Sequence, residues 1–243
     1  MNIIVSSSYE TLSDIAAKKV IEVINKKPNA VIGLATGSTP MGLYDKLVTY
    51  YKEKKVDFSK VTSFNLDEYV GLPAHHPQSY RYFMNNNFFN HINIDPKNTH
   101  LPNGMAQDIE LECKNYDTML EKSNSIDIQI LGIGTNGHIG FNEPNDTLIV
   151  GTHVAALAKE TLKANSHFFS TISEVPTKAI TMGIGNIIKA KEIVLLANGN
   201  VKSDIIRKLL NDEISTQTPA SLLKLHPHVT LIVDSLAGKF INE

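Results

Sequence analysis

The chain has 243 residues, of which 42% are hydrophobic and 20% are charged. This length favours one α/β domain over residues 1–243, because single hydrophobic cores stop growing at about 250–300 residues. The 23 basic and 25 acidic side chains give a formal charge of −2. Such a balance provides no broad positive surface for nucleic acid or for an anionic membrane, so we expect a small-molecule partner.

Cysteine content and hydropathy indicate the compartment. The single cysteine, Cys113, excludes an intramolecular disulfide, and residues 1–10 lack the basic and then apolar layout of a signal peptide. No apolar run approaches the roughly 20 residues that are needed to cross a bilayer. We therefore expect a cytoplasmic protein without a membrane-spanning segment.

Short runs rich in Val and Ile alternate along the chain with longer segments of helical period. The short runs predict strands at residues 2–5, 30–34, 61–66, 126–131, 193–197 and 229–233. Apolar residues between the first two runs are spaced as one helical stripe, and residues 41–51 predict a second helix. Several strand runs are continuously apolar, which is typical of parallel strands buried on both faces. The sequence therefore predicts an α/β fold with a Rossmann-like, open, mostly parallel sheet and helices on both faces.

Three further segments are expected to form loops. Residues 73–77 and 96–103 read as local loops, whereas residues 132–152 form a long segment rich in Gly, Asn and Thr with poor helical period. A long irregular loop inside a compact domain is usually functional. Ligands of open parallel sheets bind beyond the carboxyl ends of the strands, so we expect functional residues directly after the strands.

Residues 34–40, Leu-Ala-Thr-Gly-Ser-Thr-Pro, follow the second predicted strand. Gly37 lets the backbone approach an anion, Ser38 and Thr39 carry hydroxyl groups, and Pro40 is placed to open a helix whose free N–H groups favour negative charge. The pattern indicates a phosphate site, although an ordinary strand-to-helix turn with a capping threonine explains it equally well. The Gly-Lys-Ser/Thr ending of a Walker loop is absent, so ATP is not implied.

Two acids, Asp67 and Glu68, stand where the third predicted strand ends. One carboxylate at this point can face the ligand crevice and act as a base, and the alternative is an acid that caps a helix or lies on the surface. The histidines that follow, His75 and His76, have no third ligand nearby in the sequence. Zinc binding is therefore not expected.

The most informative segment, residues 131–144, reads Leu-Gly-Ile-Gly-Thr-Asn-Gly-His-Ile-Gly-Phe-Asn-Glu-Pro. It contains a formal G-x-G-x-x-G, but a dinucleotide fingerprint opens a helix in an early βαβ unit, and these residues have poor helix chemistry. The glycines instead favour a backbone folded closely around a ligand, with His138 and Glu143 near enough in sequence to pair. A carboxylate that orients an imidazole is a usual preparation for general acid/base catalysis.

Four motifs together, ATGSTP, NLDEYVGL, HPQSYRYFM and LGIGTNGHIGFNEP, resemble the glucosamine-6-phosphate deaminase family in order and spacing along nearly the whole chain. The resemblance implies that Asp67 moves a proton between C2 and C1 of the sugar. It also implies that His138 opens the pyranose ring and that Asn136 and Glu143 hold this histidine. Asn136 stands where some family members have Asp, so it supplies a hydrogen bond but no charge.

The resemblance also implies a site for the 6-phosphate. Gly37, Ser38 and Thr39 match the phosphate loop of the family, and Lys202 matches a phosphate-binding lysine. His167 stands where the family commonly has Arg, and we expect it to face the phosphate with fewer hydrogen bonds. Allosteric members of the family carry an Arg and a Lys at the positions of His153 and Ala155, so we expect weak or absent activation by N-acetylglucosamine 6-phosphate.

The implied reaction converts glucosamine 6-phosphate and water into fructose 6-phosphate and ammonia, in the degradation of N-acetylglucosamine, without a metal or other cofactor. Three alternatives stay open: a deaminase or isomerase acting on galactosamine 6-phosphate, a hydrolase like 6-phosphogluconolactonase, and a sugar-phosphate sensor without turnover. A sensor need not retain Asp67 and His138, which this chain has. The chain is expected to work as a monomer or a homo-oligomer.

Overall fold

A parallel sheet organises the structure, a computed structural model that describes residues 1–157, 169, 174–211 and 213–241. Within these residues the sheet has seven strands in the order β1-β10-β9-β6-β2-β3-β5, and every neighbouring pair is parallel. The strands are β1 (Asn2–Ser6), β2 (Val31–Leu34), β3 (Thr62–Asn65), β5 (Thr99–His100), β6 (Ile128–Gly132), β9 (Glu192–Ala197) and β10 (Val229–Asp234).

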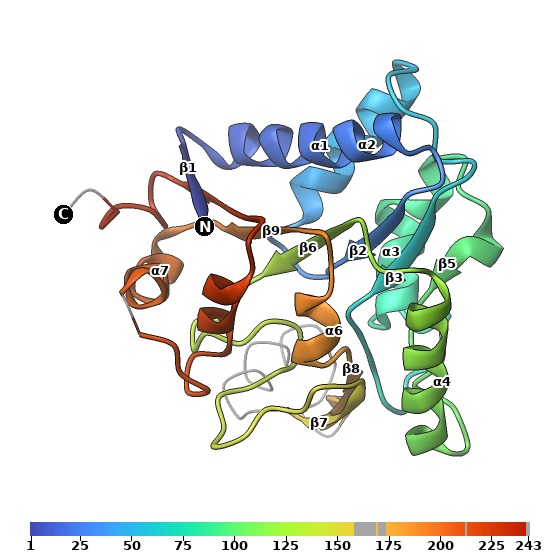
Figure 1. Ribbon diagram of the computed structural model, residues 1–243. Coiled ribbons are helices and arrows are strands. Elements are labelled where there is room, and N and C mark those ends of the chain that lie inside the picture. Colours follow the sequence, from blue (N-terminus) through green and yellow to red (C-terminus); the bar gives the residue numbers. More distant parts are fainter. Residues whose placement is uncertain (158–168, 170–173, 212, 242–243) are drawn as a thin grey trace.

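Helices cover both faces of this sheet (Figure 1). On one face α1 (Tyr9–Lys26), α2 (Met41–Lys52) and α3 (Tyr80–Asn87) pack against strand residues such as Ile32 and Leu34. On the other face lie α4 (Ile109–Lys122), α6 (Ile184–Ile188) and α7 (Ser203–Leu210). The short 3-10 helices are η1 (Phe89–His91), η2 (Pro96–Asn98), η4 (Asn200–Lys202) and η5 (Pro219–Leu225). The prediction of a mostly parallel sheet between two helical layers is confirmed.

A small antiparallel sheet lies beside the central one. Its strands follow the order β4-β8-β7, where β4 is Asp67–Tyr69, β8 is Lys178–Thr181 and β7 is His153–Ala156. Leu66 carries the chain from β3 into β4: its N–H donates to Leu34 O, and its carbonyl accepts the N–H of Met182. The two sheets are therefore joined directly at the carboxyl end of β3.

All six predicted strands are present, with boundaries that differ by one or two residues, and both predicted helices form. Residues 73–77 form turns, as expected. The loop predicted at residues 96–103 is wrong in part, because it contains η2 and then β5, which pairs with β3 at the sheet edge. Residues 133–152 contain no helix or strand beyond one isolated bridge between Ile139 and Asn142, so the prediction of a long irregular loop is confirmed from residue 133 onward.

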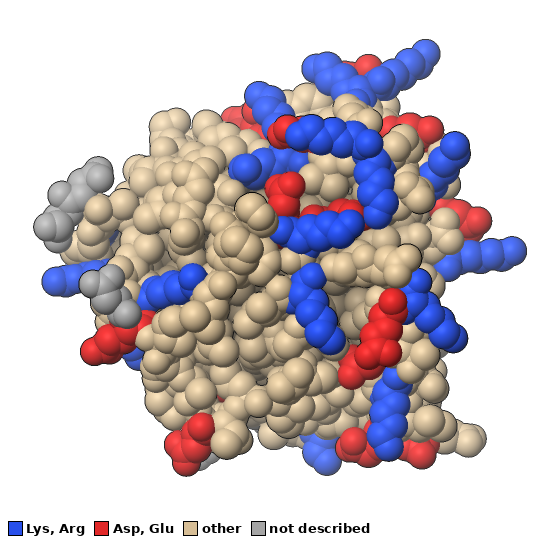
Figure 2. Space-filling view, in the orientation of Figure 1, with Lys and Arg blue, Asp and Glu red and all other residues tan. Residues whose placement is uncertain are grey.

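On the face seen in Figure 2, Lys and Arg side chains are interspersed with Asp and Glu. Several charged side chains of the described residues form ion pairs, for example Lys18 with Asp14 and Lys46 with Glu10. Among the described residues, no helix combines the length and the apolar character that a bilayer crossing requires.

Candidate active site

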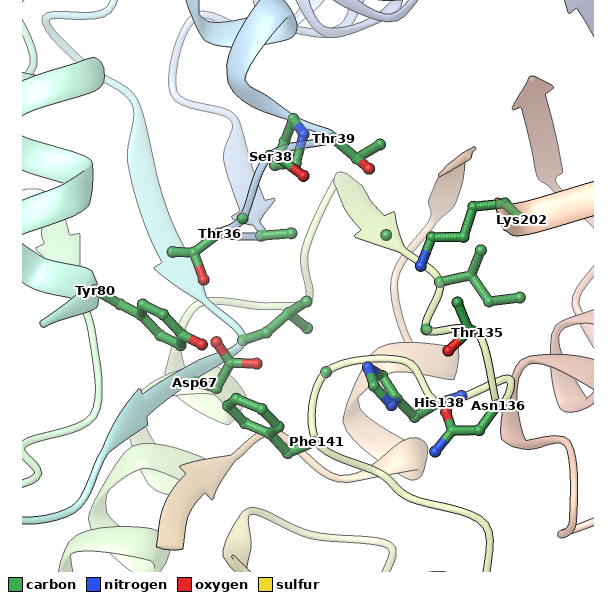
Figure 3. Close-up of a pocket in the computed structure, with 18 residues that line it drawn as sticks. Thr36, Ser38, Thr39, Asp67, Tyr80, Thr135, Asn136, His138, Phe141 and Lys202 are labelled. Atoms are coloured by element: carbon green, nitrogen blue, oxygen red, sulfur yellow. Dashed lines mark hydrogen bonds between the residues drawn. The ribbon is translucent and has the colours of Figure 1, made fainter. Parts of the chain in front are cut away.

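A cavity of about 450 Å³ opens at the carboxyl ends of β2 and β6. These two strands are neighbours in the sheet. The chain continues from β2 to β3 and β5 on one side, and from β6 to β9 and β10 on the other. Such a reversal of strand order is the usual ligand site of an open α/β sheet. The cavity wall contains residues 35–40, Leu66 and Asp67, Tyr80, much of the segment 132–141, and Lys202. Figure 3 shows Ser38 and Thr39 at one end, with Asp67 and His138 on separate walls farther in.

Asp67 presents its carboxyl group to the cavity between Tyr80 and Phe141 (Figure 3). It is only 6% exposed, and no lysine, arginine or histidine of the described residues forms an ion pair with it. Burial, and secondarily the charge of Glu68, raises the pKa of Asp67 to about 8. The group therefore has a proton affinity suited to exchange with a ligand near neutral pH.

Glu68 has a different task from its neighbour. Its carboxylate accepts the backbone N–H groups of Tyr69 at 2.9 Å, Tyr80 at 2.9 Å and Arg81 at 2.8 Å, and so it binds the first turn of α3. Burial raises the pKa of Glu68, and these three hydrogen bonds oppose the rise. Neighbouring residues of a strand point to opposite faces, so β4 directs Asp67 to the cavity and Glu68 to the helix. Asp67 thus faces the cavity, as one reading of this acidic pair requires, and Glu68 binds the start of a helix, as the other reading requires.

His138, Asn136 and Glu143 form one hydrogen-bonded group. Glu143 Oε2 accepts from Asn136 Nδ2 at 2.7 Å and lies 3.1 Å from His138 Nδ1, while the backbone N–H of His138 donates to Asn136 Oδ1 at 3.2 Å. An ionised Glu143 requires a proton on Nδ1, which leaves Nε2 of the imidazole for exchange with a ligand. Asn136 and His138 line the cavity, and Glu143 is hydrogen-bonded to both side chains.

One glycine of this loop, Gly134, is explained by the ring of His138. A Cβ atom at Gly134 would lie 2.4 Å from Cε1 of His138, so the ring packs directly on the glycine backbone. Gly134 N–H also donates to His138 O at 2.9 Å, and Gly137 adopts a φ of +91°. Because no helix follows these residues, rejection of the dinucleotide fingerprint is supported.

Two residues that the sequence did not reveal hold the loop against the small sheet. Thr181 of β8 accepts the N–H of Phe141 through its hydroxyl oxygen at 3.0 Å. Asn142 donates from Nδ2 to Ile139 O and to Met182 O, each at 2.9 Å. Both Thr181 and Asn142 are almost fully buried. No local motif marks Thr181, because its partners lie about 40 and more than 100 residues away in the chain.

The other end of the cavity carries the phosphate motif and one lysine. Gly37 has a φ of +105°, which favours glycine, and α2 begins directly after Pro40. Burial lowers the pKa of Lys202, and no carboxylate of the described residues pairs with its ammonium group. Figure 3 shows this side chain pointing into the cavity. An anion at this end would stabilise the charged form of Lys202 and so compensate for the water that its ammonium group has lost on burial.

Thr39 uses its hydroxyl group in a contact within the protein. Its hydroxyl donates to Asn198 Oδ1 at 2.7 Å and so ties the loop to the segment after β9. His167 lies outside the described residues. Among the described residues, no group of three or more His, Cys, Asp or Glu side chains is placed to hold a metal ion.

Known proteins resemble this chain in sequence and in fold. The family described as glucosamine-6-phosphate isomerases/6-phosphogluconolactonase matches residues 6–232. A protein named glucosamine-6-phosphate deaminase from Clostridium tetani is 58% identical over 241 residues, 99% of this chain and 100% of that protein. Its namesake from Thermoanaerobacter pseudethanolicus is 53% identical, over 100% of this chain and 96% of that protein.

Two solved structures have a similar fold. One described as a monomeric glucosamine-6-phosphate deaminase superimposes with a TM-score of 0.96 and 45% identity, over 98% of this chain and 99% of its own. A 6-phosphogluconolactonase from Trypanosoma cruzi superimposes with a TM-score of 0.79 over 100% of this chain and 97% of its own, but with 19% identity, so that likeness concerns the fold alone. The chain belongs to the family of glucosamine-6-phosphate isomerases and 6-phosphogluconolactonases.

Proposed function

We propose that this enzyme converts glucosamine 6-phosphate and water into fructose 6-phosphate and ammonia. One observation carries the proposal: the buried carboxyl group of Asp67 faces the same cavity as His138, which forms a hydrogen-bonded group with Asn136 and Glu143. The relatives from Clostridium tetani and Thermoanaerobacter pseudethanolicus, which carry the name of this activity, support it over the full length of the chain.

The phosphate end fixes the substrate before any proton moves. The backbone N–H groups near Gly37 and Ser38, the start of α2 and the ammonium of Lys202 would receive the 6-phosphate. Thr39 serves through its backbone while its hydroxyl holds Asn198. His167 is proposed as a further phosphate contact. A phosphate fixed several bonds away leaves C1 and C2 of the sugar to reach Asp67, and this positioning lowers the entropy cost of reaction.

Ring opening is the first chemical step. His138 accepts the proton of the C1 hydroxyl at Nε2 and returns a proton to the ring oxygen, while the C1–O5 bond breaks and the C1 aldehyde forms. Glu143 keeps Nδ1 protonated and stabilises the imidazolium that exists between the two transfers, and Asn136 holds Glu143 in place.

Proton transfer between carbons follows. Asp67 removes the C2 proton, which the new aldehyde has made acidic, the substrate ammonium group gives a proton to the C1 oxygen, and an enolamine forms. Asp67 then returns the proton to C1, which leaves an iminium at C2, and water converts this iminium into the ketone and ammonia. With a pKa of about 8, Asp67 binds the transferred proton well, and the cationic amine of the substrate favours the carboxylate that begins the step.

The reaction explains residues that the alternatives leave unused. Hydrolysis of a lactone needs no base between C1 and C2, and a sensor without turnover needs no acid/base pair. Galactosamine 6-phosphate differs at C4 alone, and the relatives named for the glucosamine reaction favour the latter substrate. We place the reaction in cytoplasmic amino sugar catabolism, because phosphorylated sugars do not cross membranes unaided. The solved deaminase described as monomeric supports a monomer.

A coupled assay of ammonia release tests the proposal. Glucosamine 6-phosphate should be turned over with a kcat/KM at least about tenfold above that for galactosamine 6-phosphate. Asp67→Asn should reduce exchange of the C2 proton with solvent deuterium by about 10³-fold and still bind the substrate, because the amide keeps the shape and loses the basicity. Faster reaction of the galactose epimer, or C2 exchange near the wild-type rate in the variant, would contradict it.

A further inference from the structure

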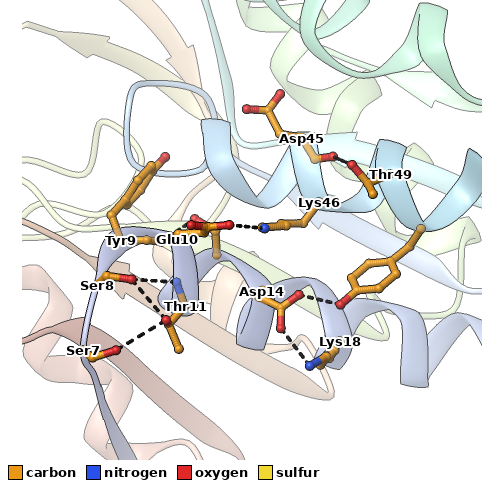
Figure 4. Close-up of polar contacts among 12 residues, drawn as sticks. Ser7, Ser8, Tyr9, Glu10, Thr11, Asp14, Lys18, Asp45, Lys46 and Thr49 are labelled. Atoms are coloured by element: carbon orange, nitrogen blue, oxygen red, sulfur yellow. Dashed lines mark hydrogen bonds and ion pairs between the residues drawn. The ribbon is translucent and has the colours of Figure 1, made fainter.

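Tyr9 reaches the phosphate loop from outside the cavity. It is the first residue of α1, and its hydroxyl oxygen lies 3.0 Å from Ser38 O and 3.0 Å from Thr39 O. The same oxygen accepts the backbone N–H of Gly42, in the first turn of α2, at 2.8 Å. Figure 4 shows the Tyr9 ring rising from the start of α1, away from the neighbouring Ser8 and Thr11. One side chain thus contacts three backbone groups of the loop and the helix behind it.

The chemistry of the phenol determines what these contacts do. Its single proton is shared between the two carbonyl oxygens, and a lone pair accepts the Gly42 N–H. The peptide bond that follows Ser38 is planar and trans, so a Ser38 carbonyl directed to Tyr9 sends the N–H of Thr39 in the opposite direction. The peptide bond between Thr39 and Pro40 offers no N–H to an anion, because proline has none. Its carbonyl oxygen carries a partial negative charge, and the contact with Tyr9 keeps this oxygen away from the anion.

The surrounding contacts make this arrangement rigid. A Cβ atom at Gly42 would lie 2.3 Å from Ser13 Oγ and 3.1 Å from Cε1 of Tyr9, so α1 packs closely on the first turn of α2. Ser13 Oγ in turn donates to Tyr9 O at 2.8 Å. On its other side the loop is bound through the hydroxyl of Thr39 to Asn198.

We propose that Tyr9 is a positioning residue for phosphate recognition: it holds the Ser38 and Thr39 carbonyl oxygens away from the anion and orients the loop N–H groups toward it. The inference rests on the phosphate role proposed above for this loop. Tyr9 touches no substrate and takes part in no proton transfer. Its loss therefore weakens the binding of the phosphate group and leaves the chemical step to Asp67 and His138.

Tyr50 provides a matched control. Its hydroxyl also joins α2 to α1, by donating to Asp14 Oδ1, but this link is at the far end of α2 and has no contact with the loop. Tyr9→Phe and Tyr50→Phe each remove one oxygen and keep the ring. The two variants therefore separate the orientation of the loop from the general attachment of the two helices.

The test measures the KM for glucosamine 6-phosphate, kcat, and the Kd for inorganic phosphate by a phosphorus NMR titration. We expect Tyr9→Phe to raise the KM and the phosphate Kd together by about three- to tenfold, as the loss of about one hydrogen bond gives. The kcat should stay within about twofold of the wild-type value, because the lost interaction stabilises the bound substrate and the transition state equally. Tyr50→Phe should leave both constants at their wild-type values.

Three results would overturn the inference: an unchanged phosphate Kd in Tyr9→Phe, a lower kcat with both binding constants unchanged, or equal losses in the two variants. Wild-type protein that binds no phosphate would overturn it as well. Wild-type protein that binds phosphate but releases no ammonia would reject the proposed reaction alone, and the phosphate titration would still decide the role of Tyr9.

Discussion

Asp67 should make the protein less stable as the pH rises. The pKa of this carboxyl group is raised from 3.8 to about 8 in the folded protein by burial, so the folded state binds a proton more tightly than the unfolded chain does. Between these two values the folded state holds the proton and the unfolded chain does not. The free energy of unfolding therefore falls by up to about 1.4 kcal/mol for each pH unit, and the ceiling over the whole interval is about 6 kcal/mol.

Asp67→Asn removes this dependence, because an amide carries no titrating proton and has a similar shape. At pH 5 the variant should be more stable than the wild type by no more than about 1 kcal/mol, because this pH lies only about one unit above the unfolded pKa of 3.8. At pH 8 it should be more stable by about 2 kcal/mol, a value below the ceiling because local rearrangement relieves part of the burial penalty. Urea unfolding at pH 5, 6, 7 and 8 measures the difference.

Asp127 supplies a control of opposite sign. Its carboxylate binds Lys27 and Lys191, each at 2.7 Å, and these partners hold its pKa below the ordinary value. Its contribution is complete above the unfolded pKa and is lost only as the pH falls through the folded pKa. Asp127→Asn should therefore destabilise the protein equally from pH 5 to 8. A stability difference between Asp67→Asn and wild type that is constant over this range would refute the reasoning about Asp67.

Three further outcomes follow from the proposed site. His138→Gln should reduce turnover at least about tenfold more with the closed pyranose than with an acyclic substrate analogue, and equal losses in the two rate measurements would argue against ring opening by His138. We expect weak or absent activation by N-acetylglucosamine 6-phosphate, because the family resemblance puts His153 and Ala155 where allosteric members carry an Arg and a Lys; a sigmoidal rate curve that this effector makes hyperbolic would contradict this expectation. His167→Arg should lower the KM severalfold at pH 8 and flatten its pH dependence, because an imidazole loses its charge above about pH 6.5 and arginine does not. An identical KM profile in this variant would place His167 away from the phosphate.

The central sheet could be predicted because its strands carry their own signal. Parallel strands covered on both faces, such as β2 and most of β9, are continuous apolar runs that stand out from the helical segments around them. The four missed strands, β4, β5, β7 and β8, are two to four residues long. Their pairing depends on partners far away in the chain, and so few residues cannot establish a period.

The acidic pair shows a finer limit of sequence reasoning. Asp67 and Glu68 are adjacent carboxylic acids after one strand, and either could serve as the base. Their roles separate only because β4 turns one side chain into the cavity and the other to the first turn of α3. That strand exists through its pairing with β8, which begins more than 100 residues later. The sequence could identify the acids but not divide the tasks between them.

The small sheet thereby links Asp67 to the loop that carries His138. In the antiparallel register Asp67 stands directly opposite Thr181, so both side chains leave the same face of that sheet. The Thr181 hydroxyl accepts the Phe141 N–H, which fixes the loop that carries His138 and Glu143. A Cβ atom at Gly140 would lie 2.9 Å from Thr181 Oγ1 and 3.6 Å from Asp67 Oδ2, and this close approach brings the loop against both residues. Thr181 therefore contributes, together with the Asn142 bond to Met182 O, to the separation between the Asp67 carboxyl group and the His138 imidazole, because the central sheet positions β2, β3 and β6 but leaves Asp67 and the loop beyond their ends.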